Sequence, residues 1–371
     1  MLMSIENLYA PLRLGSLQLP HRIVMAPLTR MRSAAGGVPT GLSAEYYAQR
    51  ASAALIITEA TGVSVQGMGY PNMPGLYSAE QVAGWYAVTK AVHAQGGRII
   101  AQIVHGGRTS HSSYSPEGAL PVAPSALAPV DGQAFTPEFS LVPFEIPRAL
   151  DIDELPGIVN DFRQSAENAM AAGFDGVEIH SANGYLLDQF LQDNSNLRED
   201  AYGGSIAGRA RLLLNVVDAI AHTIGADKVG VRLSPSGNFN DMKESNPTDL
   251  FSYVIQALSE RGIAYLHLIE PRASSVGLGD DLSFDVANNA RLFRRLFKGP
   301  VISAGGYTAQ SGSEAIAAGD ADAIAYGRMF IANPDLAARF KSGAELNAYD
   351  RNTFYGGAEL GYTDYPTLAS A

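Results

Sequence analysis

Two glycine-containing stretches in the last third of the chain combine residue types that bind phosphate. One is Ser303-Ala304-Gly305-Gly306 and the other is Tyr326-Gly327-Arg328. Glycines let a backbone approach an anion closely and present free N–H groups, and an arginine adds one fixed positive charge. Glycines at such places also make tight turns that bind nothing. Because both stretches occur together with Arg328, we favour a phosphate site over two unrelated turns.

A second set of polar residues ends or directly follows short apolar runs. His180 closes one run and is followed by Asn183 and Tyr185, while Gln102 and Arg232 lie within two other runs. A lone histidine at a strand end is usually satisfied by the backbone, and most of the 17 tyrosines must be structural. The clustering of His180, Asn183 and Tyr185 within six residues favours a functional site.

Eight short apolar runs are expected to form the strands that position these residues. They are mostly continuous rather than alternating, which is typical of parallel strands buried on both faces. The runs are residues 22–26, 54–59, 98–103, 176–180, 229–233, 265–269, 300–303 and 323–326.

Helical patterns fill the gaps between the runs, and several end at a glycine, as at Gly173 and Gly225. Eight β/α units predict an α/β protein with a (β/α)₈ TIM barrel, in a single domain covering residues 1–371. Functional residues of this fold gather at the carboxyl ends of the strands. A doubly wound open sheet is the alternative, but it usually has a glycine-rich turn after its first strand, and residues 25–30 (MAPLTR) contain no glycine. The expected helices are residues 78–95, 152–172, 205–224, 247–261, 284–297, 308–318 and 333–340.

Roughly a third of the chain exceeds the ~250 residues of a basic barrel. Residues 12–22 read as a hairpin that closes the bottom of the barrel. Residues 106–148 form a long insertion after the third strand and are expected over the top. The segment past Lys341 is a tail rich in glycine, tyrosine and aspartate.

Composition excludes several classes of function. The 371 residues carry a formal net charge of −11, which argues against a nucleic-acid partner. There is no cysteine, so disulfides, thiolate nucleophiles and cysteine-ligated metals are excluded. No HExxH spacing indicates a metal. With no signal-like N-terminus and no apolar run near ~20 residues, we expect a cytoplasmic protein without a membrane partner, either a monomer or a homodimer.

The sequence resembles the Old Yellow Enzyme family of FMN-dependent ene-reductases along its whole length. The motifs that carry the resemblance are residues 25–30 (MAPLTR), residues 180–205 (HSANGYLLDQFLQDNSNLREDAYGGS), and Tyr326-Gly327-Arg328 followed by residues 331–335 (IANPD). Some relatives have Cys where this chain has Thr29, so the chain is similar to the Thr-bearing, N-ethylmaleimide reductase-like branch.

The resemblance implies a set of flavin-binding residues. Thr29 corresponds to the position whose hydroxyl bonds the flavin C4 carbonyl, and Gln102 and Arg232 correspond to those that hold the pyrimidine side. A guanidinium there favours the reduced, anionic flavin. The full implied FMN set is Pro27, Leu28, Thr29, Ala60, Gln102, Arg232, Ala304, Gly305, Gly306, Gly327 and Arg328.

The resemblance also implies the reaction. NADPH or NADH would reduce the flavin, and flavin N5 would then give hydride to the β-carbon of an activated alkene such as an enone, enal, maleimide or nitroalkene. His180 and Asn183 would bind the carbonyl or nitro oxygen, and Tyr185 would protonate the α-carbon. Tyr70 and Tyr355 would line the substrate pocket, where Val104 replaces a larger aromatic of many relatives.

Two other functions stay open at this point. One is a flavin reductase of nitro-esters, nitroaromatics or quinones, which the same residues could serve. The other is a barrel without flavin, acting as a lyase or isomerase or only binding a ligand. A lyase of this kind needs a catalytic base or lysine at a strand end, and none is evident.

Overall fold

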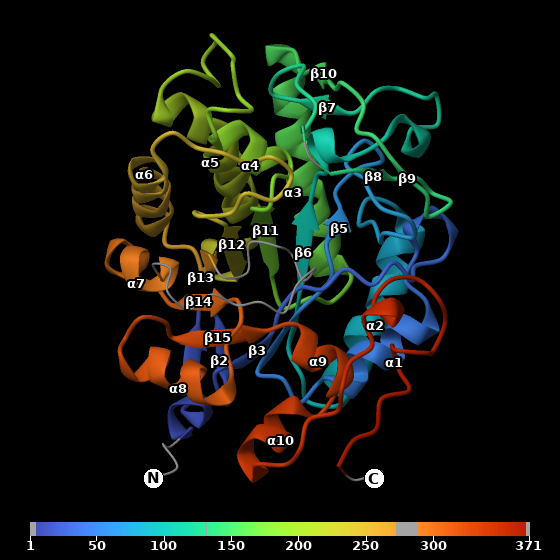
Figure 1. Cartoon of the computed structure of the whole chain (residues 1–371), viewed down its shortest axis with the longest axis vertical. Helices are drawn as coiled ribbons and strands as arrows, with labels where there is room; N and C mark the ends of the chain where they lie inside the picture. Colours follow the sequence, from blue (N-terminus) through green and yellow to red (C-terminus); the bar gives the residue numbers. More distant parts are fainter. Residues whose placement is uncertain (1–4, 131, 272–287, 369–371) are drawn as a thin grey trace.

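The centre of the molecule is a closed barrel of eight parallel strands (Figure 1). The computed structural model describes residues 5–130, 132–271 and 288–368. Pairing of β11 with β6 joins the two ends of the sheet, so the predicted (β/α)₈ barrel is confirmed and the open sheet is wrong. The barrel strands are β3 (Ile23–Met25), β4 (Leu55–Ile57), β6 (Ile99–Val104), β11 (Val177–Ser181), β12 (Val229–Leu233), β13 (Tyr265–Ile269), β14 (Val301–Ala304) and β15 (Ala323–Tyr326).

Side chains along each strand alternate between two cores, as the pleat requires. Ile56, Ile179 and Val231 point outward and join the layer shared with the helices. Leu55 and Ile302 point inward and fill one end of the barrel. At the other end the inward positions of β6, β11, β12 and β13 are polar, and this half of the interior is where a site can form.

The helices surround the barrel in sequence order. Several begin at side-chain caps: the hydroxyls of Ser78, Ser205 and Thr308 each accept an N–H from the first turn. Glycines at positive φ follow the helices that end at Ala171 and Ile224, with φ angles of 83° at Gly173 and 92° at Gly225. The helices are α1 (Gly41–Gln49), α2 (Ala79–Ala94), α3 (Leu155–Ala171), α4 (Leu186–Leu191), α5 (Ile206–Ile224), α6 (Pro247–Glu260), α7 (Asn289–Phe293), α8 (Ala309–Ala317), α9 (Arg328–Ala332) and α10 (Leu336–Ser342).

Several predicted boundaries need correction. Helix α1, between the first two barrel strands, was not predicted at all, and neither were α4 and α9. The helix expected over residues 152–172 is a 3₁₀ turn, Ile152–Glu154, followed by α3. The helix expected over residues 284–297 is the short α7 and a 3₁₀ turn, Arg294–Leu296, with residues 284–287 outside the described part. The last predicted helix, 333–340, begins three residues later, as α10.

The three predicted additions to the barrel are present. Strands β1 (Leu12–Leu14) and β2 (Leu17–Leu19) form an antiparallel hairpin, whose Leu14 and Leu19 pack on the inward apolar core and close that end. The insertion contains β7 (Val122–Ala123), β8 (Ala134–Phe135), β9 (Leu141–Val142) and β10 (Arg148–Ala149), and Figure 1 shows β7 and β10 above β6 and β11.

Among the described helices, none combines the length and apolarity that crossing a bilayer requires.

Candidate functional site

The predicted site residues from three strands meet at the polar end of the barrel. Parallel pairing places His180 of β11 beside Arg232 of β12, and Arg232 beside His267 of β13. On the other side of β11, Glu178 is beside Gln102 of β6. These positions alternate with outward apolar residues, so all five side chains project into the barrel.

Tyr185 and Tyr70 come together next to His180. The Tyr185 ring lies 4.8 Å from the His180 ring, centroid to centroid, in an edge-on arrangement. The Tyr185 hydroxyl is hydrogen-bonded to the Tyr70 hydroxyl. Tyr70, Tyr185, Ala60 and Val104 belong to one small apolar cluster, separate from the main core. The structure therefore places Tyr70 and His180, two predicted substrate-binding residues, in contact with Tyr185, the predicted proton donor.

Burial sets the protonation states in this cluster. It raises the pKa of Tyr185 to about 12, against a hydrogen bond from Tyr70 that lowers it, so the phenol keeps its proton at neutral pH. Burial, together with the charge of Arg232, lowers the pKa of His180 to about 3. His180 is therefore a neutral imidazole, and within the described residues its Nδ1 has no hydrogen-bond partner.

The turn that carries Asn183 is held by side chains from the segment after β12 and from α4. Asn183 has a positive φ of 57°, and its N–H donates to the Ser234 hydroxyl at 2.9 Å while its carbonyl accepts from Asn240 Nδ2 at 2.8 Å. The Gly184 N–H donates to buried Asp188 at 2.9 Å. A Cβ at Gly184 would lie 2.7 Å from Asn240 Cβ, so only glycine fits. Asn183 is thus fixed beside the mouth and half-buried.

Arg232 has the features expected of a residue that binds an anion. It is half-exposed while its neighbours on β12 are buried, so its side chain reaches into the mouth. Among the described residues its Nε has no hydrogen-bond partner. Burial lowers the pKa of the guanidinium, and Glu178 opposes that effect. The buried N–H at Nε is costly while it has no partner, and a bound anionic group would satisfy it.

The two glycine stretches lie side by side, as the phosphate prediction requires. Ala304 of β14 pairs with Ala325 of β15, so both loops leave the same end of the barrel. Gly305 and Gly306 have φ angles of 132° and 64°. Gly327 adjoins Leu28, because a Cβ there would lie 3.3 Å from the Leu28 side chain. The guanidinium of Arg328 stands 5.8 Å from the ring centre of Tyr349.

The loop after β3 is fixed by a buried carboxylate. Glu59 accepts the N–H groups of Arg30 and Met31 at 3.0 and 3.3 Å, immediately after Thr29. Pro27, Leu28 and Thr29 are all half-buried at the mouth. This loop also adjoins the β15 end, where the Ala26 N–H donates to the Tyr326 carbonyl.

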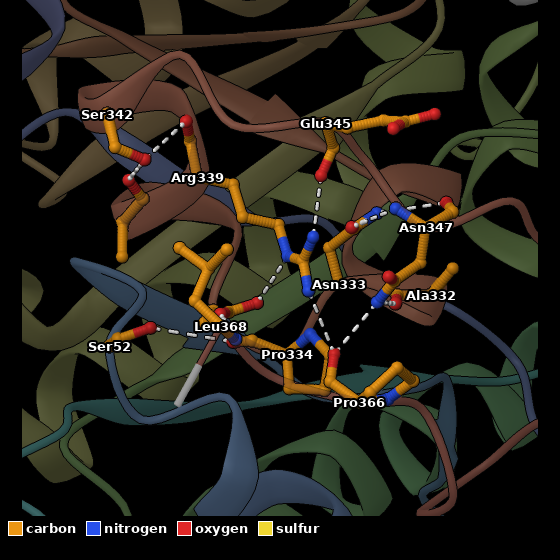
Figure 2. A network of polar contacts seen from close by, with 12 residues as sticks. Ser52, Ala332, Asn333, Pro334, Arg339, Ser342, Glu345, Asn347, Pro366 and Leu368 are labelled. Carbon is orange, nitrogen blue, oxygen red and sulfur yellow. Dashed lines mark hydrogen bonds and ion pairs between the residues drawn. The ribbon is translucent and has the colours of Figure 1, made fainter. Parts of the chain in front are cut away.

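Tyr355 reaches the site because arginines hold the tail. Arg30 donates to the carbonyls of Phe354 and Gly361 at 2.9 and 2.8 Å, and the Gly356 N–H returns a bond to the Arg30 carbonyl. Further along, Arg339 and Asn347 both donate to the Pro366 carbonyl (Figure 2). Tyr355 is 44% exposed, and it lies near enough to Tyr70 and Tyr185 to raise the pKa of both phenols.

Three buried polar residues of the interior were not identified from the sequence. Glu178 lies two residues before His180, His267 pairs with Arg232, and Tyr265 lies two residues before His267 on the same strand. The available signal was a polar residue at an inward position of an otherwise apolar strand, as in GVEIH and YLHLI.

Comparison with known proteins gives a consistent result. The model of the NADH:flavin oxidoreductase / NADH oxidase family matches residues 7–347. The chain is 47% identical to 12-oxophytodienoate reductase 2 of Arabidopsis thaliana over 365 residues, covering 98% of this chain and 96% of the relative. It is 45% identical to putative 12-oxophytodienoate reductase 11 of Oryza sativa subsp. japonica over 369 residues, covering 99% of both chains.

Solved structures agree in fold. Morphinone reductase superposes with a TM-score of 0.93 at 47% identity, covering 99% of this chain and 98% of that chain. One structure of morphinone reductase is a complex with tetrahydroNAD. An Old Yellow Enzyme homologue from Zymomonas mobilis superposes with a TM-score of 0.92 at 43% identity, covering 97% of this chain and 99% of that chain.

Proposed function

The chain belongs to the NADH:flavin oxidoreductase / NADH oxidase family, whose cofactor is FMN, and on this premise we propose that it is an NAD(P)H-dependent ene-reductase of activated C=C bonds. The predicted resemblance to the Old Yellow Enzyme family is confirmed, as are an oxidoreductase and FMN as its cofactor. The alternative of a barrel without flavin is wrong. We further propose that residues 1–371 form one flavin-binding domain, since the barrel uses strands from β3 to β15 and the tail is bonded back to Arg30.

The mouth of the barrel fits a flavin. We assign the ring to the residues around Arg232, whose orphaned Nε needs an anionic or acceptor partner. We assign the phosphate to the adjacent glycine loops with Arg328. The chemistry that FMN supplies when bound is two-electron transfer from a reduced nicotinamide to an acceptor. The proposed holding residues are Pro27, Leu28, Thr29, Ala60, Gln102, Arg232, Ala304, Gly305, Gly306, Gly327 and Arg328.

The observation that carries the proposed reaction is the contact between Tyr185 and His180 at this mouth. Tyr185 holds a proton on its hydroxyl, since its pKa is about 12. In this proposal it delivers that proton to the α-carbon of the alkene, as a general acid. The Tyr70 hydroxyl is hydrogen-bonded to the same hydroxyl and, as a donor, would support the phenolate left behind.

His180 and Asn183 are proposed to bind the carbonyl or nitro oxygen of the acceptor. His180 is neutral and Asn183 is an amide, so each offers one N–H without carrying charge. Two such donors stabilise negative charge as it develops on the oxygen, and loss of one typically costs ~10²–10³ in rate. Tyr70, Tyr355 and Val104 would form the remaining walls of the pocket.

The test is an acceptor panel on purified protein. The preparation should be yellow, or become so with added FMN, and NADPH or NADH should bleach it under anaerobic conditions. Enones, maleimides and nitroalkenes are then compared with nitro-esters, nitroaromatics and quinones by kcat/KM. The proposal predicts that the alkenes rank first, and a clear preference for quinones or nitro compounds would contradict it.

A further inference from the structure

A fully buried carboxylate lies inside the barrel, level with Gln102 and one layer of side chains below Arg232. Glu178 has no solvent exposure, and three side chains from two other strands converge on it. Its Oε1 accepts from Gln102 Nε2 at 2.8 Å, and its Oε2 accepts from the Tyr265 hydroxyl at 3.0 Å and from His267 Nδ1 at 2.8 Å. The proposed reaction gives Glu178, Tyr265 and His267 no function.

A glycine makes the network possible. Gly230 of β12 pairs with Glu178 on one side and with Tyr265 on the other. A Cβ at Gly230 would lie 2.1 Å from the Tyr265 ring. The ring therefore lies over the Gly230 backbone, and its hydroxyl reaches a carboxylate two strands away. Any larger residue at position 230 would exclude the ring, so the glycine serves this crossing rather than a turn.

Glu178 is an anion at neutral pH. Burial alone would raise the pKa of the carboxyl, but His267, Arg232 and Gln102 together outweigh burial and leave the pKa below its ordinary value. Burial lowers the pKa of His267, which is therefore neutral and donates its Nδ1 proton to the carboxylate. The buried group thus carries one negative charge beside the positive charge of Arg232.

Packing alone does not account for a buried carboxylate at this place. Apolar side chains of similar volume generally stabilise a core as well as or better than buried charges do. The inward positions of β4 and β14 are indeed aliphatic. The charge lies instead on the side of the barrel that holds Gln102 and Arg232.

We propose that Glu178 is a positioning residue of the flavin site, which fixes the amide of Gln102 and offsets the charge of Arg232, so that the bound flavin has a lower reduction potential than Arg232 alone would give. The inference rests on the proposed placement of Gln102 and Arg232 at the flavin. One amide N–H of Gln102 is committed to Glu178, which turns its carbonyl oxygen away from the carboxylate. Gln102 then offers an acceptor to the flavin.

The test is the reduction potential of the FMN-loaded protein, from an anaerobic spectroelectrochemical titration at pH 7 with a reference dye. E178Q should raise the ratio of reduced to oxidised flavin about tenfold at a fixed potential, equal to about 30 mV for a two-electron couple. Y265F is the matched control, because it removes a hydrogen bond from the same carboxylate but no charge. It should lower the Tm and leave the ratio within twofold of wild type.

A merely structural role would change the Tm and not the potential. An E178Q ratio within twofold of wild type, or an equal shift in Y265F, would overturn the proposal. If E178Q does not load FMN, R232M and E178Q/R232M are compared, since the double variant leaves no unpaired buried charge. The ratio of reduced to oxidised flavin in the double variant should be at least fivefold that in R232M. Equal ratios in these two variants would overturn the proposal. The titration uses no alkene or nicotinamide, so it stays informative even if alkene reduction fails.

Discussion

The ring of Tyr185 stands almost perpendicular to the imidazole of His180, at 79°, with 4.8 Å between the two centroids. His180 comes from strand β11 and Tyr185 from the N-terminal end of helix α4, where the Leu186 N–H donates to the His105 carbonyl. The turn between them is fixed at its backbone, so phenol and imidazole face the same space. One small acceptor can contact both.

Contact with Tyr70 should make the Tyr185 hydroxyl a stronger acid. The hydrogen bond from Tyr70 lowers the pKa of Tyr185, so Y70F should raise that pKa and make the phenol a weaker acid. Loss of one such bond is worth about 1 kcal/mol, and we expect alkene-dependent reoxidation of the flavin to slow about fivefold. Stopped-flow absorbance measures this rate. Y86F, on the exposed face of α2, serves as the control; an unchanged rate in Y70F would show that the contact has no catalytic effect.

Buried histidines should make the fold acid-sensitive. Burial lowers the pKa of His105 to about 3, against an ordinary value of 6.5 in the unfolded chain. Between these values the unfolded chain binds a proton that the folded chain does not, so stability is complete above pH 6.5 and is lost as the pH falls towards 3. The expected slope is ~1.4 kcal/mol per pH unit per histidine.

His180 behaves in the same way, and burial also lowers the pKa values of His267 and His21, so H105Q should remove one histidine's share of this loss, ~1.4 kcal/mol per pH unit between pH 6.5 and 4.5. Urea unfolding at several pH values measures it. H222Q, at an exposed position on α5, should leave the slope unchanged. A slope in H105Q equal to that of wild type would refute the assignment.

The tail should set the affinity for the acceptor through Tyr355. Arg32 donates to the carbonyls of Thr353 and Phe354 at 2.9 and 3.2 Å, directly before Tyr355. R32Q should lower the Tm and raise KM for enones about three- to tenfold, because the ring loses its support. R339Q breaks similar bonds to Glu345 and Pro366, farther along the tail. It should lower the Tm without changing KM, and equal KM values in the two variants would contradict the role of Tyr355.

Arg328 should distinguish FMN from riboflavin. A charge-assisted hydrogen bond contributes ~1.5–3 kcal/mol, so R328M should raise the Kd of FMN about 10- to 100-fold. Riboflavin has no phosphate, and its Kd should stay within twofold. Fluorescence quenching on apoprotein measures both constants. An equal rise in the Kd values of FMN and riboflavin would place Arg328 away from the phosphate.

The barrel could be predicted because buried parallel strands leave continuous apolar runs, and β12, β13 and β15 have the predicted bounds. Helix α1 could not, because it begins at Gly41 and buries Tyr46 and Tyr47 rather than a stripe of aliphatic residues. Hydrophobic periodicity does not register such a helix.

The candidate site was predictable where motifs are local, as at residues 180–185. Its supports are not local. Arg30 is bonded to carbonyls more than 320 positions away, and Tyr265 reaches Glu178 across another strand. Nothing in the neighbouring sequence shows such contacts, because they depend on which strands pair and in which register.

The most direct test of the central claim is Y185F, followed by stopped flow in each half-reaction. The anaerobic enzyme is first mixed with NADPH or NADH, and the reduced enzyme is then mixed with an enone. We expect flavin reduction within twofold of wild type and alkene-dependent reoxidation slowed at least ~10²-fold, the usual contribution of a general acid. Reoxidation at the wild-type rate, or equal impairment of both half-reactions, would contradict the assignment of Tyr185 as the proton donor.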